Sequence, residues 1–331
     1  MKKKILISTG GSGGHIMPAI TIQDHLKIEY DILISTDLRG LKYLQNSTHK
    51  IVIVDTPKLN NIIFLPFAFI KIFFLIIKSL FLLKKEKIKI LISTGGYMSL
   101  PLCLAAKILN IKIFLIEPNM VIGRANKFFL NFCEKIICYS KNIISFPNKF
   151  ENKLIISNPL IRKKYYEKSS KERINKLFTI MVIGGSQGAK IFDKIIHEVI
   201  VNISKIHSLR IIHQTNQKNI DFLKNYYSEN KIENNVFSFD QNLNIFLSQS
   251  DLCITRAGAS SLAELSILNI PFIAIPLPTA KDNHQLENAN YYKNKDCCWI
   301  VEQKDFYKKN FEDLLLDIMK DKDNLIKKKI I

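Results

Sequence analysis

The chain begins with a short apolar run, Ile5 to Ser8, that stops on Gly10-Gly11-Ser12-Gly13-Gly14-His15. The same arrangement returns in the second half, where an apolar run ends on Gly184-Gly185-Ser186-Gln187-Gly188-Ala189. Glycine has no Cβ, so a ligand can approach the backbone closely, and the N-terminus of a following helix offers free N–H groups and a partial positive charge. Each loop therefore suits an anionic or hydroxyl-rich ligand, and one loop near the start of each half suggests a cleft between two domains.

Short β-branched apolar runs alternate with segments of helical period, which predicts parallel sheets flanked by helices. A length of 331 residues favours two domains, which we place at 1–158 and 159–331. We expect the helix around Phe306 to Lys320 to pack back toward the first domain. The expected strands are Ile5–Ser8, Ile32–Ser35, Ile51–Val54, Ile90–Ser93, Ile111–Ile116, Lys135–Cys138, Leu177–Ile183, Leu209–His213, Val236–Phe239, Leu252–Thr255 and Pro271–Ile275.

The net charge of +19 raises the question of a nucleic-acid or anionic-membrane partner. The basic residues are almost all lysine, and no helix-turn-helix, finger or aromatic-basic RNA platform is visible, so no nucleic-acid partner is predicted. The six cysteines have no paired spacing that would hold zinc, and we interpret them as reduced packing residues of a cytosolic protein. No cleavable signal peptide is visible after Met1.

One segment, Ile62 to Leu83, is almost continuously apolar and long enough to raise the question of a transmembrane helix. Pro66, Lys71 and Lys78 argue against a lone span, and the next expected strand follows after only a few residues. We therefore predict a helix packed on the sheet whose surplus apolar side touches an anionic membrane interface; a wholly buried helix is the alternative. Basic residues that would lie near the head groups follow at Lys84, Lys85, Lys87 and Lys89.

His15 is the candidate general base of the first loop. It falls in the first helical turn, where its imidazole can face whatever the glycines hold, and histidine titrates near neutral pH. A capping or surface histidine is the alternative. A dinucleotide site must also be considered, because Asp37 ends the second strand where a ribose-binding acid would lie, but the loop lacks the third glycine of Gly-x-Gly-x-x-Gly.

The second half supplies candidates for a nucleotide site. Ser186 and the backbone around it can meet a pyrophosphate at a helix N-terminus. Glu264 lies one turn into another strand-to-helix element and can accept both hydroxyls of a ribose, although a capping box with Ser260 or Ser261 is possible. The polar run from Pro276 to Ala289 favours sugar hydroxyls as partners.

Together these motifs resemble the MurG family, which transfers N-acetylglucosamine from UDP-N-acetylglucosamine to lipid I in peptidoglycan synthesis. The resemblance covers about residue 5 to about residue 300. It rests on six motifs in the family's order, at Gly10–His15, Ser93–Pro101, Glu117–Asn126, Gly184–Ala189, Arg256–Leu265 and Ala280–Ala289.

The resemblance implies a GT-B architecture of two Rossmann-like domains with parallel sheets facing a cleft, inverting chemistry, and neither metal nor cofactor. It implies a peripheral protein on the cytoplasmic face of the inner membrane, with UDP-N-acetylglucosamine, lipid I and the anionic membrane surface as partners. His15 matches the base proposed for the family. Asp240 is at the position whose backbone would contact the uracil. The remaining substrate-binding positions implied are Ser12, Gly13, Gly14, Asn119, Arg162, Ser186, Ala259, Ser260, Ser261, Leu262, Ala263, Glu264 and Gln285.

The sequence departs from the family pattern at a few positions. Ile116 and Pro118 replace a His and a Gln, Asp240 replaces an isoleucine, and one extra residue precedes Arg162. Two other classes of function stay open. A UDP-sugar epimerase or hydrolase would need carboxylates where the chain has glycine and histidine, and a non-catalytic membrane-associated binding protein would tolerate loss of His15.

Overall fold

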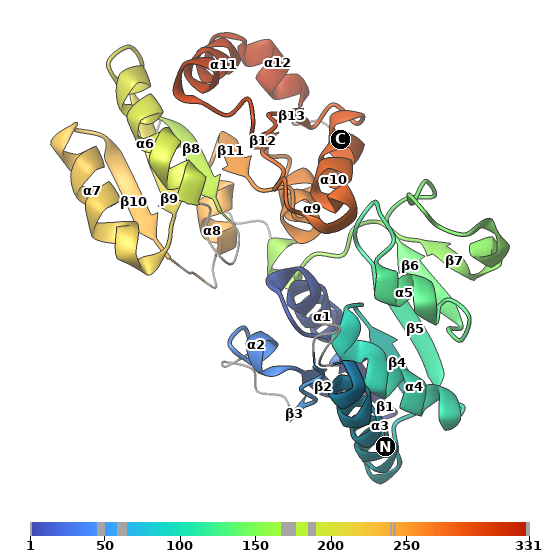
Figure 1. Cartoon of the computed structure of the whole chain (residues 1–331). Coiled ribbons are helices and arrows are strands. Elements are labelled where there is room, and N and C mark those ends of the chain that lie inside the picture. The colour runs from blue at the N-terminus through green and yellow to red at the C-terminus, as the bar shows by residue number, and fades with distance from the viewer. Residues whose placement is uncertain are drawn as a thin grey trace. The chain divides into compact units, whose positions relative to one another are not determined.

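The computed structural model describes residues 2–44, 50–57, 65–166, 177–184, 190–238, 240 and 243–328. The chain forms two compact units, Met1–Lys163 and Lys164–Ile331 (Figure 1). The boundary follows Lys163 rather than residue 158 because the connecting segment packs on the first unit. Ile161 is buried and its carbonyl oxygen lies 2.9 Å from His25 Nε2, and Leu160 packs on the core of the first unit.

The first unit is built on a seven-stranded parallel sheet with the order β3-β2-β1-β4-β5-β6-β7. The six strands predicted in this half are all present. The seventh, β7, was not predicted; it is a three-residue edge strand with two exposed isoleucines. The strands are β1 (Lys4–Ser8), β2 (Asp31–Thr36), β3 (Lys50–Ile53), β4 (Ile90–Ser93), β5 (Lys112–Glu117), β6 (Lys135–Cys138) and β7 (Leu154–Ile156).

Alternate residues of the central strand β1 are buried on opposite faces of this sheet. Ile5 and Ile7 join a cluster with Ile16 and Ile22 of α1, while Leu6 is buried on the other face. The helices are α1 (Gly13–Leu26), α2 (Leu38–Leu41), α3 (Leu65–Lys85), α4 (Leu100–Ile108) and α5 (Arg124–Phe129), with the short 3-10 helices η2 (Tyr97–Ser99) and η3 (Asn148–Lys153), and η4 (Lys163–Tyr165) at the unit boundary.

Helix α3 is the apolar segment singled out in the sequence; its residues 62–64 lie outside the described chain. It packs on α4 through a narrow stripe, Ala68, Ile72, Ser79 and Leu83. It is long and apolar enough to cross a membrane by length and composition, but only 17% of its most apolar window is buried. The alternative of a wholly buried helix is therefore wrong. Six large apolar side chains are 56–71% exposed: Phe67, Phe69, Ile70, Phe73, Phe74 and Phe81.

Just beyond α3, an ion cluster fixes the end of this helix to the sheet. Glu86 accepts hydrogen bonds from Lys4 Nζ at 2.6 Å and from Lys50 Nζ, at the starts of β1 and β3. These bonds lower the pKa of the Glu86 carboxyl to about 2. The turn after α3 is thereby tied to two strands.

The second unit is built on a six-stranded parallel sheet with the order β10-β9-β8-β11-β12-β13. The five predicted strands are present, and the three-residue edge strand β13 was not predicted. The strands are β8 (Phe178–Ile183), β9 (Leu209–Gln214), β10 (Glu233–Phe237), β11 (Leu252–Thr255), β12 (Phe272–Ala274) and β13 (Cys298–Ile300). The helices are α6 (Lys190–Ser204), α7 (Ile220–Glu229), α8 (Leu243–Ser248), α9 (Ala259–Ile267), α10 (His284–Lys293), α11 (Lys308–Lys320) and α12 (Lys322–Lys327), with η5 (Gln217–Asn219) and η6 (Lys281–Asn283).

Helix α11 packs on α6 within the second unit, whereas the sequence analysis had expected its packing surface on the first domain. Phe311, Leu315 and Ile318 lie in the same core cluster as the buried face of α6, and Asn202 of α6 donates to Glu312 at 2.9 Å. The apolar face of α11 is thus buried within the second unit. The strong amphipathic pattern gave the helix correctly, but many cores can accept such a face.

All six cysteines are buried free thiols, three in each unit. Burial raises the pKa of each thiol, to about 12 for Cys103, Cys138 and Cys298. The interpretation of the cysteines as reduced packing residues is confirmed.

Candidate functional site

The first glycine loop joins the carboxyl end of β1 to α1. Gly10 and Gly11 have φ values of +152° and +80°. A Cβ on Gly10 would stand 2.9 Å from Asp37 Oδ1, and a Cβ on Gly11 would overlap Met98, so both the conformation and the space require glycine. Ser12 occupies the N-cap of α1 without a side-chain capping bond, Gly13 is buried and Gly14 is exposed. The loop thus exposes backbone at a helix N-terminus.

His15 is half-buried and held from two sides. Its Nδ1 lies 2.8 Å from the carbonyl oxygen of Thr94, and its own carbonyl oxygen accepts the Thr9 hydroxyl at 2.8 Å. Because a carbonyl can only accept, Nδ1 carries the proton of the neutral ring and Nε2 has its lone pair available. Nε2 would lie 3.3 Å from a Cβ on Gly96, another glycine with positive φ. The geometry suits a general base that faces the two glycine loops.

Asp37 supports the first glycine loop. Its carboxylate accepts from the backbone N–H of Gly11 at 2.8 Å and of Gly40 at 2.9 Å, and from Arg39 at 2.9 and 2.7 Å. Burial raises the pKa of Asp37, but these hydrogen bonds outweigh burial and hold the pKa below its usual value. The carboxylate is occupied by protein donors, so the dinucleotide alternative loses its ribose-binding acid.

Glu117, at the end of β5, positions Asn119. One carboxylate oxygen accepts from the backbone and side-chain N–H of Asn119 at 3.2 and 3.0 Å. The other accepts from Gly123 N at 2.7 Å and Asn126 Nδ2 at 3.0 Å, with Glu117 only 3% exposed. The carboxyl ends of the neighbouring strands β1, β4 and β5 therefore bring His15, the Gly95-Gly96 loop and Asn119 to one edge of the sheet.

The departures at Ile116 and Pro118 fall at buried positions. Ile116 is 3% exposed and packs in the core with α1, and Pro118 is also buried. The Glu117–Asn119 arrangement is intact without the family's His and Gln.

In the second unit, the start of α9 offers main-chain donors. The N-cap is Gly258, and Leu262 N bonds to Gly258 O at 3.0 Å, so the N–H groups of Ala259, Ser260 and Ser261 precede the first intrahelical bond. These three residues are half-buried, whereas Leu262, Ala263 and Glu264 are buried. Since Ser260 and Ser261 lie inside the helix, the capping-box alternative for Glu264 is wrong.

Arg256 and Asn288, which the sequence argument did not assign, fix the loop before α9. Arg256 donates to the carbonyls of Ile275 and Pro276 at 3.1 and 3.3 Å and to Gln303 at 2.7 Å, with its guanidinium 4.9 Å from the Phe192 ring centroid. Asn288 Nδ2 donates to Ala257 O at 3.2 Å. Burial lowers the pKa of Arg256. Both side chains are thus structural supports.

The remaining predicted positions are less sharply defined. Gln285 is half-buried in the first turn of α10, and its Oε1 accepts from Leu277 N at 2.9 Å. Asp240 is half-buried beyond β10, and Arg162 is half-buried in the first unit, not in the second where the sequence division put it. Ser186 lies outside the described residues. Among those that are described, no cluster of three His, Cys, Asp or Glu side chains could hold a metal ion.

A buried carboxylate in the first turn of α6 was missed by the sequence argument. Asp193 Oδ2 accepts from the Thr215 hydroxyl and Asn219 Nδ2, both at 2.7 Å, and Oδ1 lies 3.4 Å from His213 Nε2. His213 is fully buried and its Nδ1 lies 2.9 Å from the Tyr227 hydroxyl. Burial lowers the pKa of His213. The available signal in the sequence was the acidic residue Asp193, one helical turn after the second glycine loop.

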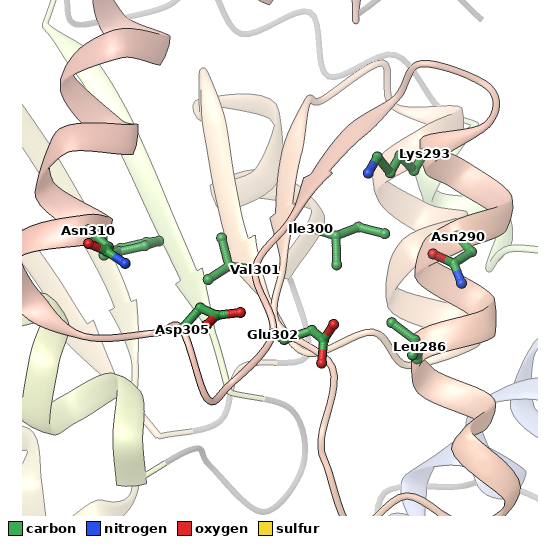
Figure 2. A pocket seen from close by; sticks show the side chains of 9 residues that line it. Leu286, Asn290, Lys293, Ile300, Val301, Glu302, Asp305 and Asn310 are labelled. Carbon is green, nitrogen blue, oxygen red and sulfur yellow. The ribbon is translucent and has the colours of Figure 1, made fainter.

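A cavity of about 370 Å³ lies among α10, β13 and α11 of the second unit (Figure 2). Its polar lining includes Asn290, Lys293, Glu302, Asp305 and Asn310, which Figure 2 labels. None of the predicted site residues lines it.

The family models match both units. Residues 5–138 match the glycosyltransferase family 28 N-terminal domain and residues 179–330 the glycosyltransferase family 28 C-terminal domain. The chain is 48% identical over 331 residues to a UDP-N-acetylglucosamine--N-acetylmuramyl-(pentapeptide) pyrophosphoryl-undecaprenol N-acetylglucosamine transferase of Pelagibacter ubique (strain HTCC1062), covering 99% of this chain and 93% of the relative. It is 34% identical to the protein of the same name from Rickettsia canadensis (strain McKiel), covering 96% and 91%.

Solved structures share the fold. The crystal structure of Acinetobacter baumannii MurG matches with a TM-score of 0.76 at 21% identity, covering 99% of this chain and 95% of that chain. A UDP-N-acetylglucosamine 2-epimerase from Neisseria meningitidis, bound to UDP-N-acetylglucosamine, matches with a TM-score of 0.66 at 13% identity, covering 99% and 94%. At these identities the likeness shows the two-domain α/β, GT-B-like fold alone.

Proposed function

The chain belongs to the MurG family of family 28 glycosyltransferases, and we propose from this that it transfers N-acetylglucosamine from UDP-N-acetylglucosamine to the 4-hydroxyl of the N-acetylmuramyl residue of lipid I. The product is lipid II, the disaccharide precursor of peptidoglycan. The reaction inverts the configuration at the anomeric carbon of the transferred sugar.

The observation that supports this chemistry best is the orientation of His15. With Nδ1 donating to Thr94 O, Nε2 can take the proton of the acceptor hydroxyl while that oxygen attacks the anomeric carbon. The bond from this carbon to the diphosphate oxygen breaks, and UDP leaves with the bonding electrons. Asn119, held by Glu117, is proposed to bind the donor sugar together with the backbone of Ser12, Gly13 and Gly14.

The second unit is proposed to bind the nucleotide. The N–H groups at the start of α9 can stabilise the diphosphate as negative charge develops on it, and the buried Glu264 can accept from the ribose hydroxyls. Ser186 and Arg162 are proposed contacts of the diphosphate, the backbone of Asp240 of the uracil, and Gln285 of the sugar.

The direct test is incubation of the purified protein with labelled UDP-N-acetylglucosamine and a short-chain lipid I analogue. We expect label in a disaccharide product and release of UDP that both depend on the acceptor. Release or epimerisation of the sugar with UDP-N-acetylglucosamine alone would support the epimerase or hydrolase class instead. Binding of both substrates without any turnover would support a non-catalytic binding protein.

We further propose that α3 holds the protein on the cytoplasmic membrane surface as a peripheral protein. Its exposed aromatic residues suit shallow insertion, and Lys71, Lys78, Lys84 and Lys85 are all exposed beside them. A span is disfavoured because α3 packs on α4 and its C-terminal turn is tied to β1 and β3 through Glu86. A crossing helix would draw these elements into the hydrocarbon.

Reversing the four lysines to glutamate should release the protein from anionic vesicles, because each lysine contributes about 1 kcal/mol near such a surface. Transfer to a long-chain acceptor should fall, and transfer to a soluble analogue should not. The matched control reverses four exposed lysines of the second unit, Lys205, Lys224, Lys309 and Lys320. Vesicle binding that is insensitive to salt and survives the reversal at α3 would contradict the proposal.

A further inference from the structure

Arg39 is a cationic group beside the first glycine loop for which the proposed chemistry has no role: a Cβ on Gly11 would lie 3.4 Å from its guanidinium. Its Nε and one Nη nitrogen donate to Asp37 Oδ2 at 2.9 and 2.7 Å, and the same Nη donates to the Tyr97 hydroxyl. The side chain is 43% exposed, and within the described chain its other Nη nitrogen makes no hydrogen bond. The guanidinium is therefore held in one orientation while part of its fork remains open to an anion.

Arg39 and His15 each share a glycine neighbour with Met98. A Cβ on Gly11 would meet both Met98 Cε and, at 3.4 Å, the Arg39 guanidinium. A Cβ on Gly96 would meet both Met98 Sδ and, at 3.3 Å, His15 Nε2. One ligand lying along these two glycines can thus touch the base at one end and the guanidinium at the other.

The same guanidinium is linked to α3 through charged neighbours. Lys71 of α3 lies 3.7 Å from Asp55 Oδ2, and the Thr56 hydroxyl donates to Met98 O at 3.2 Å. Burial lowers the pKa of Arg39, but its hydrogen bond to Asp37 and the charges of Asp37, Tyr97 and Asp55 outweigh burial and raise the pKa. A row of groups thus leads from the helix proposed to face the membrane to the glycine loop.

We propose that Arg39 binds the diphosphate of the lipid-linked acceptor, with Tyr97 holding the guanidinium in place. This inference rests on the proposed function, in which the acceptor is a pyrophosphoryl lipid. Its lipid must stay at the membrane while its sugar reaches His15, and the diphosphate joins the two. A planar guanidinium fork beside the first glycine loop matches two phosphates better than a lysine would.

The test compares two acceptors in steady-state kinetics, a short-chain diphosphate acceptor and an analogue with a neutral linker in place of the diphosphate. For Arg39→Gln we expect the KM of the diphosphate acceptor to rise about tenfold to a hundredfold, as for loss of a charge-assisted contact. The KM of the neutral analogue and that of UDP-N-acetylglucosamine should stay unchanged. Tyr97→Phe, which leaves the Asp37–Arg39 pair intact, should give a smaller rise of the same kind. Lys42→Gln removes a nearby exposed charge and should change nothing.

A binding measurement separates this proposal from the proposed function. Calorimetry of inorganic pyrophosphate with UDP-saturated protein should detect a site that Arg39→Gln loses and Arg39→Lys keeps in part. If the native protein transfers no sugar but this site is present, the proposed function fails and the anion site stands. Equal pyrophosphate binding by native protein and Arg39→Gln, or an equal rise in KM for both acceptors, would overturn the proposal.

Discussion

The carboxyl edges of the two sheets offer different chemical groups to a ligand. In the first unit, groups that face the edge are held by hydrogen bonds: the His15 imidazole by the Thr94 carbonyl, the Asn119 amide by the Glu117 carboxylate, and the Gly11 N–H by Asp37. In the second unit, Arg256 and Asn288 donate to backbone carbonyls and so support the loop before α9. There the groups left for a ligand are largely main-chain N–H at small residues. Oriented side chains suit chemistry, and oriented backbone suits binding of an anion.

The largest expected effect comes from the base in the first unit. His15→Ala should lower kcat by about a hundredfold or more, because the proposed general base is lost, while UDP affinity should barely change. Steady-state kinetics with calorimetry of UDP would measure both. The control is His207→Ala, which changes a histidine just before the amino end of β9 in the second unit. Equal turnover in the His15 variant would move the base elsewhere and remove the contrast between the units.

The opposite pattern is expected for the second unit. Glu264→Ala should weaken UDP binding by about 1 to 3 kcal/mol, as for a charge-assisted hydrogen bond to the ribose. Glu264→Gln keeps the volume of this buried side chain and should give a smaller loss. Calorimetry showing unaltered affinity for Glu264→Ala would make this carboxylate part of the fold and not of the nucleotide site.

A third comparison uses one buried carboxylate from each unit, Glu117 in the first and Asp193 in the second. Glu117→Gln turns one acceptor oxygen into a donor that faces backbone or amide N–H groups, at a cost of about 1 to 3 kcal/mol in the free energy of unfolding. Because Asn119 loses its support, kcat should fall as well. Asp193→Asn should cost similar stability but raise the KM of UDP-N-acetylglucosamine. The comparison fails if both variants change the same kinetic constant.

The smallest effect concerns the tie between α3 and the sheet. Since the folded Glu86 carboxyl has a pKa of about 2, below its unfolded value, its ion pairs stabilise the fold above about pH 4.5, and this stabilisation is lost as the pH falls toward 2. The gain is modest because Lys50 is largely exposed. Urea unfolding of the native protein and Glu86→Gln at several pH values should give free energies that differ near pH 6 and converge near pH 2. A constant difference would exclude this linkage.

Local sequence patterns predicted most of the fold. Long β-branched runs such as Phe178–Ile183 are visible because a strand buried on both faces needs apolar residues throughout. The three-residue edge strands β7 and β13 were missed because a short strand paired on one side leaves almost no periodic pattern. The helix expected around Phe306 to Lys320 is present at Lys308–Lys320, but the surface that covers its apolar face could not be predicted.

The candidate site was predictable where chemistry follows a loop motif, and not where a partner comes from elsewhere in the chain. His15 stands out beside its glycines, but its bond to Thr94 joins residues 79 positions apart. The bond of Asp193 to Thr215 also depends on strand order, which no local pattern contains. The strand-to-helix motif and the family resemblance both indicated Glu264, while its burial inside α9 came from the structure.

The six buried cysteines are natural probes for the opening of each unit. Cys103, Cys133 and Cys138 report on the first unit, and Cys253, Cys297 and Cys298 on the second. A buried thiol with a raised pKa reacts slowly with alkylating reagents until its surroundings open. Pulse alkylation followed by peptide mass spectrometry can therefore time the opening of the two units separately in one unmodified chain. Added UDP should slow labelling of the second group more than the first if the nucleotide is held by the second unit.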